Sequence, residues 1–449
     1  MTGLENEMPA EGNDGLQRSV SLLLLLSRMD FSSVQKRLVA EELKSFNEWK
    51  LLAGLAVRHG VAALIWQNLS DLGHAGEVPA TEKTLLEGLR FKSIARVSWI
   101  TEAAAGVTAL LEREGIKVVL LKGLALEHTV YGSKGLRQMS DADLLVAPSD
   151  ALRARDILVR EGFRSMSLKS PLYRHIILDL GNHLPELHRG GISVDLHYRL
   201  FGPEGEEMVE RAIRDSIIIT GGGREPDRNV AVTRESGAGT GAVVSSRADI
   251  PGTGAIASSR TDIPGAGKLR ILPPMTAFLA LVSHIYKHEI KGEFQLRLWT
   301  DIYLLLDRYG KQILTARLAA AAEEVGIRKE TATVLTVMEQ VWRVALPEDI
   351  ASDSPAAKEA AVASFMNRLA HPGSVGSISQ REMFMRNLKA LKSTRKKFIF
   401  ILGDIFPSVG FMKRRYNCRS KVAAFLFYPH RLGKIPWILG HLRTEKYDN

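Results

Sequence analysis

Residues 135–146 read Gly-Leu-Arg-Gln-Met-Ser-Asp-Ala-Asp-Leu-Leu-Val, and this stretch decides how the rest of the chain is interpreted. Its apolar end, residues 144–146, predicts a buried strand, and the carboxylates of Asp141 and Asp143 lie at the start of that strand. Alternate side chains of a strand share a face, so we expect Asp141 and Asp143 to point the same way. Two carboxylates on one face repel each other unless a cation lies between them. The stretch therefore predicts a divalent-metal site.

A second short strand is predicted just before this stretch. Residues 118–121 are all apolar and are followed by Lys122-Gly123. A glycine that precedes a short helix leaves room and free backbone N–H groups for a triphosphate. Lys122 and Arg137 are the cations that we expect to meet phosphates, Lys as a point charge and Arg as a fork. Arg137 could instead pair with Asp141 or Asp143.

A third carboxylate, Asp195, follows in a predicted hairpin. Residues 183–188 and 192–197 flank a turn that contains two glycines. Mg²⁺ takes oxygen ligands, and a third carboxylate on a neighbouring strand would complete a two-metal site for in-line displacement at phosphorus. His197 shares the face of Asp195 and is either a substrate-binding group, a base or a hydrogen-bonded core histidine.

Helical patterning fills the chain on both sides of this α/β core. Apolar residues recur at helical spacing before residue 98 and again from residue 273 to residue 443. Between the core and the second helical part, residues 220–267 are rich in Gly and Ser and poor in large apolar side chains, which predicts a disordered insertion. We therefore divide the chain into a disordered start (1–15), a helical region (16–97), the core (98–202), the insertion (220–267) and a helical region that is basic toward its end (271–449).

Composition narrows the class of protein. The chain has 449 residues, a formal charge of +10 and a single cysteine, so an intramolecular disulfide and a Cys-rich zinc cluster are excluded. The acidic start is unlike a secretory leader, and no apolar run reaches the roughly 20 residues of a membrane span. We expect a cytoplasmic protein without a transmembrane segment. The late cations form either a solvated face or a contact for a polyanion such as nucleic acid or a membrane surface: Arg395, Lys396, Lys397, Lys413, Arg414, Arg415, Arg419 and Lys421.

Two histidines of the second helical region, His284 and His288, are four residues apart and could share one helix face. No glutamate lies between them as in a zinc-protease motif, so a metal role is not expected for this pair.

The order of the motifs resembles the uncharacterised bacterial nucleotidyltransferase family of the polymerase-β superfamily. The resemblance rests on Lys122-Gly123 after a strand, on residues 135–146, and on Asp195 within residues 192–197. It implies an α+β fold, in which a polymerase-β-like palm (a small mixed sheet with helices) is flanked by N-terminal and C-terminal helical regions.

The same resemblance implies Mg²⁺- or Mn²⁺-dependent transfer of a nucleotidyl group from an NTP, with ATP as the expected nucleotide. The acceptor stays open between a small molecule, a protein and a nucleic acid. Leu124 stands after Gly123 where the superfamily usually has Ser or Gly, which keeps open a regulatory role on a degenerate palm; the basic end keeps open nucleic-acid binding. The implied metal-binding and catalytic residues are Asp141, Asp143 and Asp195, and the implied nucleotide-binding residues are Lys122, Gly123, Arg137 and Ser140.

Overall fold

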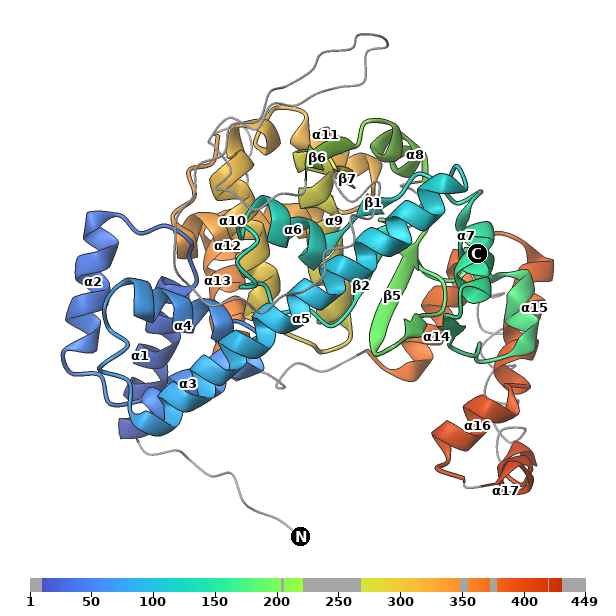
Figure 1. Ribbon diagram of the computed structural model, residues 1–449, viewed down its shortest axis with the longest axis horizontal. Coiled ribbons are helices and arrows are strands. Elements are labelled where there is room, and N and C mark those ends of the chain that lie inside the picture. Colours follow the sequence, from blue (N-terminus) through green and yellow to red (C-terminus); the bar gives the residue numbers. More distant parts are fainter. Residues whose placement is uncertain are drawn as a thin grey trace, which may run out of the picture.

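The computed structural model describes residues 10–202, 206–220, 268–347, 354–371, 378–418 and 420–429. A mixed sheet lies at the centre of the molecule, with helical regions on either side (Figure 1). The α+β class predicted from the sequence is therefore confirmed. Nearly all of the predicted insertion, residues 221–267, lies outside the described residues.

The sheet has seven strands in the order β3-β4-β5-β2-β1-β7-β6. Strand β2 pairs in parallel with β5 and antiparallel with β1, so the sheet is mixed at its centre. The strands are β1 (Val119–Leu120), β2 (Ala142–Leu145), β3 (Arg164–Ser165), β4 (Leu187–Arg189), β5 (Ile192–His197), β6 (Ile217–Thr220) and β7 (Lys268–Ile271). The predicted strands and the predicted hairpin β4–β5 are present, but β1 is shorter than the apolar run 118–121, and β4 begins only at Leu187 of the predicted segment 183–188.

Three strands were not predicted: the two-residue strand β3, and the longer strands β6 and β7. Strands β6 and β7 pair with each other antiparallel, and β7 pairs in parallel with β1 through Leu120 and Ile271. The sheet of the core therefore continues beyond residue 202, where the sequence division ended it. Strands β6 and β7 have only four residues each, and such short runs carry too little periodicity to be recognised locally.

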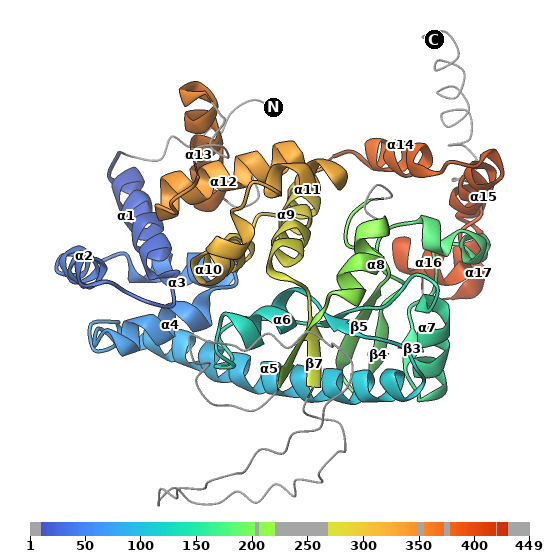
Figure 2. The same cartoon turned by 90° about the horizontal axis from the view of Figure 1, so that it is seen from above.

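Helix α5 (Ala80–Arg113) joins the N-terminal helices to the sheet. The expected boundary between residues 97 and 98 falls inside this continuous 34-residue helix. Leu86 belongs to the core of the helical regions, whereas Ile100 and Val107 belong to the core of the sheet. Figure 2 shows α5 running from the N-terminal helices along the sheet to α7 (Ala151–Arg160). By length and composition α5 could also cross a membrane, a test that core helices of soluble proteins pass as well.

The N-terminal region contains the helices that the sequence predicted, with one correction at its start. Helix α1 begins at Ala10, so residues 10–15 are helical rather than disordered. The Ser19 hydroxyl donates to the carbonyl of Gly15 at 2.8 Å, and the next residue after Gly15, Leu16, already packs into the core. The helices of this region that precede α5 are α1 (Ala10–Leu26), α2 (Ser33–Leu43), α3 (Trp49–Arg58) and α4 (Ala62–Asp71).

The later helices divide into two groups. The first group packs with the N-terminal helices into one core: α9 (Pro274–Ile290), α10 (Leu296–Ile313), α11 (Leu318–Glu324), α12 (Arg328–Trp342) and α13 (Pro355–Ala370). The second group returns to the sheet, where Phe400 stacks on Tyr173 at 5.6 Å between ring centroids. It consists of α14 (Gln380–Ala390), α15 (Thr394–Ile405), α16 (Val409–Arg415) and α17 (Lys421–Phe425). Between the strands lie α6 (Lys122–Thr129), η1 (Pro171–His175), η2 (Ile177–Asp179) and α8 (Glu206–Arg214).

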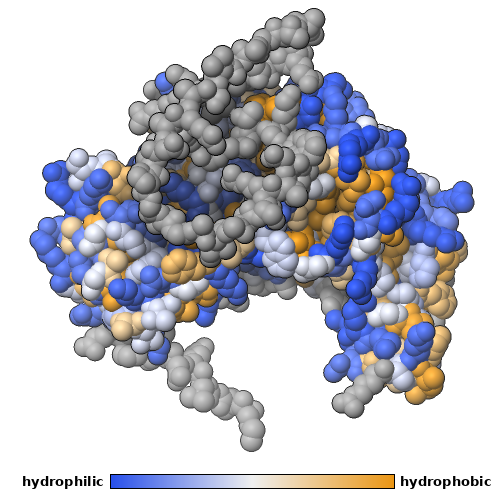
Figure 3. Space-filling view, in the orientation of Figure 1, coloured by the Kyte–Doolittle hydropathy of each residue, from blue (hydrophilic) through white to orange (hydrophobic). Residues whose placement is uncertain are grey.

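The basic residues singled out near the end of the chain lie on this second group, except for Arg419, which lies outside the described residues. Lys396 pairs with Asp179 at 2.8 Å, and Arg414 donates to the Ser167 hydroxyl at 3.1 Å. Apolar surface side chains lie beside hydrophilic ones on these helices, toward the lower right of Figure 3. Some of the cations therefore bind the helices to segments that adjoin the sheet, η2 and the residues just after β3. Contact with a polyanion stays a prediction.

Candidate active site

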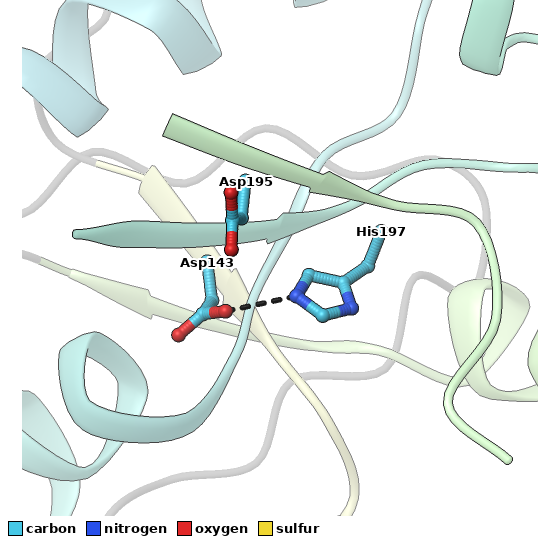
Figure 4. A group of neighbouring side chains, drawn as sticks. All are labelled: Asp143, Asp195 and His197. Carbon is cyan, nitrogen blue, oxygen red and sulfur yellow. Dashed lines mark hydrogen bonds and ion pairs between the residues drawn. The ribbon is translucent and has the colours of Figure 1, made fainter. Parts of the chain in front are cut away.

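The parallel pairing of β2 and β5 brings two of the predicted carboxylates together. Asp143 and Asp195 are direct partners across the two strands, which confirms that the third carboxylate lies on a neighbouring strand. Asp195 and His197 are two residues apart on β5 and share a face. Ligand atoms of Asp143, Asp195 and His197 all lie within 4.8 Å of one another (Figure 4). Asp141 lies just before β2, on the wall of the same cavity.

Asp143 is the best-paired member of this group. Its Oδ1 lies 2.6 Å from Lys122 Nζ and 2.8 Å from His197 Nε2. Burial opposes ionisation of Asp143, but the positive charge of Lys122 and the hydrogen bond of His197 outweigh it and hold the pKa well below its usual range. Asp143 is therefore ionised at neutral pH and available to a cation.

His197 is neutral at physiological pH. Burial, followed by the nearby charge of Lys122, lowers its pKa to about 4. A neutral imidazole is a metal ligand through whichever ring nitrogen carries the lone pair. His197 is thus a hydrogen-bonded buried histidine, which is one of the roles that its sequence position allowed, and it also lies at the candidate metal site, which the sequence did not suggest.

Asp195 is the least satisfied member of the group. Its Oδ1 is buried, and no hydrogen-bond partner for it exists in the described part of the chain. Burial raises the pKa of Asp195 to about 6, with the His183 side chain acting against this and Asp143 adding to it. A buried carboxylate oxygen without a partner costs free energy, and a divalent cation would satisfy it. The residues present therefore fit a divalent metal with oxygen and nitrogen ligands.

Asp141 and Ser140 border the group on the cavity side. Burial, and then the charge of Asp143, raises the pKa of Asp141. The Ser140 hydroxyl donates to Asp141 Oδ1 at 3.2 Å. A cation between Asp141 and Asp143 would reduce the repulsion between the two carboxylates, as the alternation of side chains along the strand suggested.

Lys122 occupies an unusual position at the start of α6. Its φ of 47° lies in the left-handed region, which costs a non-glycine residue about 1–2 kcal/mol. Its Nζ reaches Asp143 and lies 3.3 Å from His197 Nε2. The sequence predicted a phosphate contact for Lys122, and the structure brings its ammonium group to the carboxylates while the side chain also lines the cavity.

Arg137 has a partner that the sequence did not suggest. Its Nε lies 2.9 Å from Asp301 Oδ1 and its Nη2 lies 2.7 Å from Asp301 Oδ2, in a bidentate buried pair. Tyr131 donates to the same Asp301 carboxylate at 2.9 Å. Gly123 is packed beneath this arginine, where an added Cβ would lie 3.4 Å from Arg137 Cζ. Asp301 was detectable only as a charge inside an apolar helix, where burial demands a partner.

A cavity of about 2120 Å³ opens beside the carboxylates. Its wall includes Lys122, Asp141, Asp195 and His197, together with residues of α9. Ligand pockets commonly have about 300–1,000 Å³. This cavity therefore has room for a nucleotide together with a second substrate.

The α9 wall is the part of the site that the sequence did not reveal. Four of its side chains line the cavity: His284, Lys287, His288 and Lys291. The two histidines were weighed only as a metal pair, and their rings lie 4.5 Å apart between centroids. The lysines carried no local signal, because an exposed helical lysine and a cavity lysine look alike in sequence.

Comparison with known proteins agrees with the geometry. Residues 45–221 match the model of a family described as an uncharacterised nucleotidyltransferase. This segment contains β2, β5 and the candidate metal ligands. Comparison with curated proteins and with solved structures gave no match. The resemblance and the fold class that it implied are confirmed over residues 45–221, which are similar to an uncharacterised nucleotidyltransferase family.

Proposed function

We propose that this protein is a Mg²⁺-dependent enzyme that transfers a nucleotidyl group from an NTP, with ATP as the preferred donor, to an acceptor hydroxyl. The observation that carries the proposal is the parallel register of β2 and β5, which sets Asp143 beside Asp195, and Asp195 lines a large cavity. The family match supports nucleotidyl transfer as the class of reaction. The nucleotide, the metal and the acceptor are the proposed parts.

Asp143, Asp195 and His197 would hold the metal, with Asp141 facing the nucleotide side. A divalent ion in such a site neutralises phosphate charge and activates the attacking oxygen. The reaction forms a bond between the acceptor oxygen and the α-phosphorus, and it breaks the bond from the α-phosphorus to the bridging oxygen of pyrophosphate. The proton of the acceptor leaves with solvent or passes to a carboxylate of the site.

The side chains at and around the site have separate roles in the proposed reaction. Asp195 Oδ1, which lacks a partner in the described residues, can accept a hydrogen bond from the acceptor hydroxyl and orient it. Lys122 supplies a positive charge at the boundary between the carboxylates and the cavity. The Arg137–Asp301 ion pair holds the backbone that precedes β2 and takes no part in the reaction. Catalysis is then mainly positioning and charge neutralisation.

Calorimetry tests the proposal directly. Titration of the wild-type protein with Mg²⁺ and ATP should give saturable binding, which Asp143→Asn should abolish because it removes the charge that the metal needs. Asp195→Asn should reduce transfer more than it reduces ATP binding. Asp156→Asn is the matched control, since Asp156 lies on the exposed side of α7 and pairs with Arg155.

Transfer itself is measured with α-³²P-labelled NTPs and Mg²⁺, with and without cell extract as a source of acceptor. Metal-dependent labelling of an acceptor is the expected result. ATP binding without labelling under any of these conditions would support the regulatory alternative. Unchanged binding and unchanged labelling in Asp143→Asn would remove the proposal.

A further inference from the structure

Helix α9 presents a stripe of nitrogen-bearing side chains to the cavity. His284, Lys287, His288 and Lys291 are spaced i, i+3, i+4 and i+7, and this spacing places them on one helix face. All four line the same cavity as Asp195 and Lys122. Figure 2 shows α9 next to α6 and at the end of β7.

Lys287 lies close to the end of β5. Its Nζ is 3.4 Å from the carbonyl oxygen of Leu200, just after His197. Burial, followed by the charges of Lys122, Arg386 and Lys291, lowers the pKa of Lys287 to about 8. Burial, and then the charge of the same Lys122, lowers the pKa of His284 well below its usual range. The distance from Lys287 to Leu200 and the shared lining place the α9 stripe at the same cavity as the carboxylate group.

The positive charges of Lys287 and Lys291 are not balanced by carboxylates of the described residues. No ion pair to Lys287 or Lys291 is found within the described ranges, and Lys122 forms an ion pair with Asp143. The acidic neighbours on and after α9 are already engaged: Glu289 pairs with Arg368 at 2.7 Å, and Glu293 pairs with His288 at 2.7 Å. Cations gathered without a counter-charge raise one another's free energy, and an anion relieves this cost.

The two walls together define the kind of ligand that the cavity suits. One wall carries carboxylates that fit a divalent metal, and the other carries ammonium and imidazole donors. A chain of phosphates satisfies both walls, because its oxygens can bind a metal on one side and accept charge-assisted hydrogen bonds on the other. A neutral ligand or a single carboxylate would leave one wall uncompensated.

We propose that Lys287 and Lys291, with His284 as a neutral N–H donor, form the subsite for the β- and γ-phosphates of the nucleotide, the part that leaves as pyrophosphate. This inference rests on the proposed function and adds a residue set outside the segment matched by the family. During transfer, negative charge accumulates on the bridging oxygen as its bond to the α-phosphorus breaks. The α9 cations lie where they stabilise that charge.

The test uses the full-length protein and inorganic tripolyphosphate as the probe, with Mg²⁺ and also with EDTA. Lys287→Gln and Lys291→Gln should each weaken tripolyphosphate and ATP binding by about tenfold, the worth of one charge-assisted hydrogen bond. Adenosine binding should stay unchanged, because the nucleoside lacks the phosphates. Lys83→Gln is the control, since Lys83 is exposed on α5 away from the cavity.

Lys287→Arg separates a charge effect from a folding effect. It should restore most of the tripolyphosphate affinity that Lys287→Gln loses, whereas damage to the fold would lower adenosine binding and the melting temperature as well. Unchanged tripolyphosphate affinity in both glutamine variants would overturn the inference while leaving nucleotidyl transfer intact. If the wild-type protein binds tripolyphosphate through Lys287 but transfers no nucleotide, the subsite stands and the proposed function fails.

Discussion

Two buried charge groups lie close together in this protein and differ in how completely they are satisfied. In the first, Arg137 and Asp301 are 5% and 0% exposed, and the carboxylate also receives the Tyr131 hydroxyl. In the second, Asp143 is paired twice, yet Asp195 has an oxygen with no partner among the described residues and faces a cavity. A saturated buried network stabilises a fold, whereas an unsaturated one beside a cavity is typical of a binding site.

Asp301→Asn breaks the saturated group and should give the largest effect. It leaves the buried Arg137 guanidinium without a counter-charge, which costs about 3–5 kcal/mol of unfolding free energy. Urea denaturation measures this loss. Arg137→Met combined with Asp301→Asn should recover part of the stability, because the unpaired charge is gone. A stability loss below about 1 kcal/mol for the single change would show that the pair is not structural.

Asp143→Asn is the same chemical change made in the other group, and its effect should fall on activity. We expect transfer to drop by about 10²–10³-fold, roughly 3–4 kcal/mol of transition-state stabilisation. The urea midpoint should change far less than for Asp301→Asn, because Lys122 is partly exposed and can turn toward solvent. Labelled-NTP transfer and denaturation on both variants complete the comparison. Equal stability losses in the two would erase the distinction drawn above.

Lys122→Met sharpens the comparison by removing the internal cation of the second group. Asp143 would then bind Mn²⁺ without competition from an ammonium group 2.6 Å away, and Mn²⁺ affinity should rise by about tenfold. ATP affinity should fall, because a phosphate contact is lost as well. Titration with Mn²⁺ followed by electron paramagnetic resonance measures the free ion. Lys122→Arg keeps the charge and should show no gain in Mn²⁺ affinity.

The pH dependence of phosphate binding should give the smallest effect. The pKa of Lys287 is lowered to about 8 by burial and by Lys122, Arg386 and Lys291, so its charge is present below that pH and is lost above it. Tripolyphosphate affinity should therefore fall by about fivefold to tenfold from pH 7 to pH 9. Lys287→Arg should flatten this part of the profile, because arginine stays charged. A profile that is identical in the two proteins would argue against a contact at Lys287.

The candidate site could be predicted in part because its signals are local. Asp141, Asp143 and Asp195 stand at the ends of short apolar runs, and strand alternation alone relates Asp195 to His197. The helices α3 and α4 were equally readable, since their apolar residues recur at helical spacing. The sequence could not show that the boundary at residue 97 falls inside a helix, because one continuous apolar stripe of α5 packs against two cores.

The sequence by itself therefore determined the class of fold, the candidate carboxylates and the resemblance to a nucleotidyltransferase family, each of which depends on residues close together along the chain. The tertiary structure alone decided which groups meet: β2 beside β5 in parallel, Arg137 with Asp301, Lys122 with Asp143, and α9 at the same cavity. These contacts join residues that are 21 to more than 100 positions apart. Strand pairing and helix packing over such separations depend on the shape of the whole core, which local periodicity does not encode.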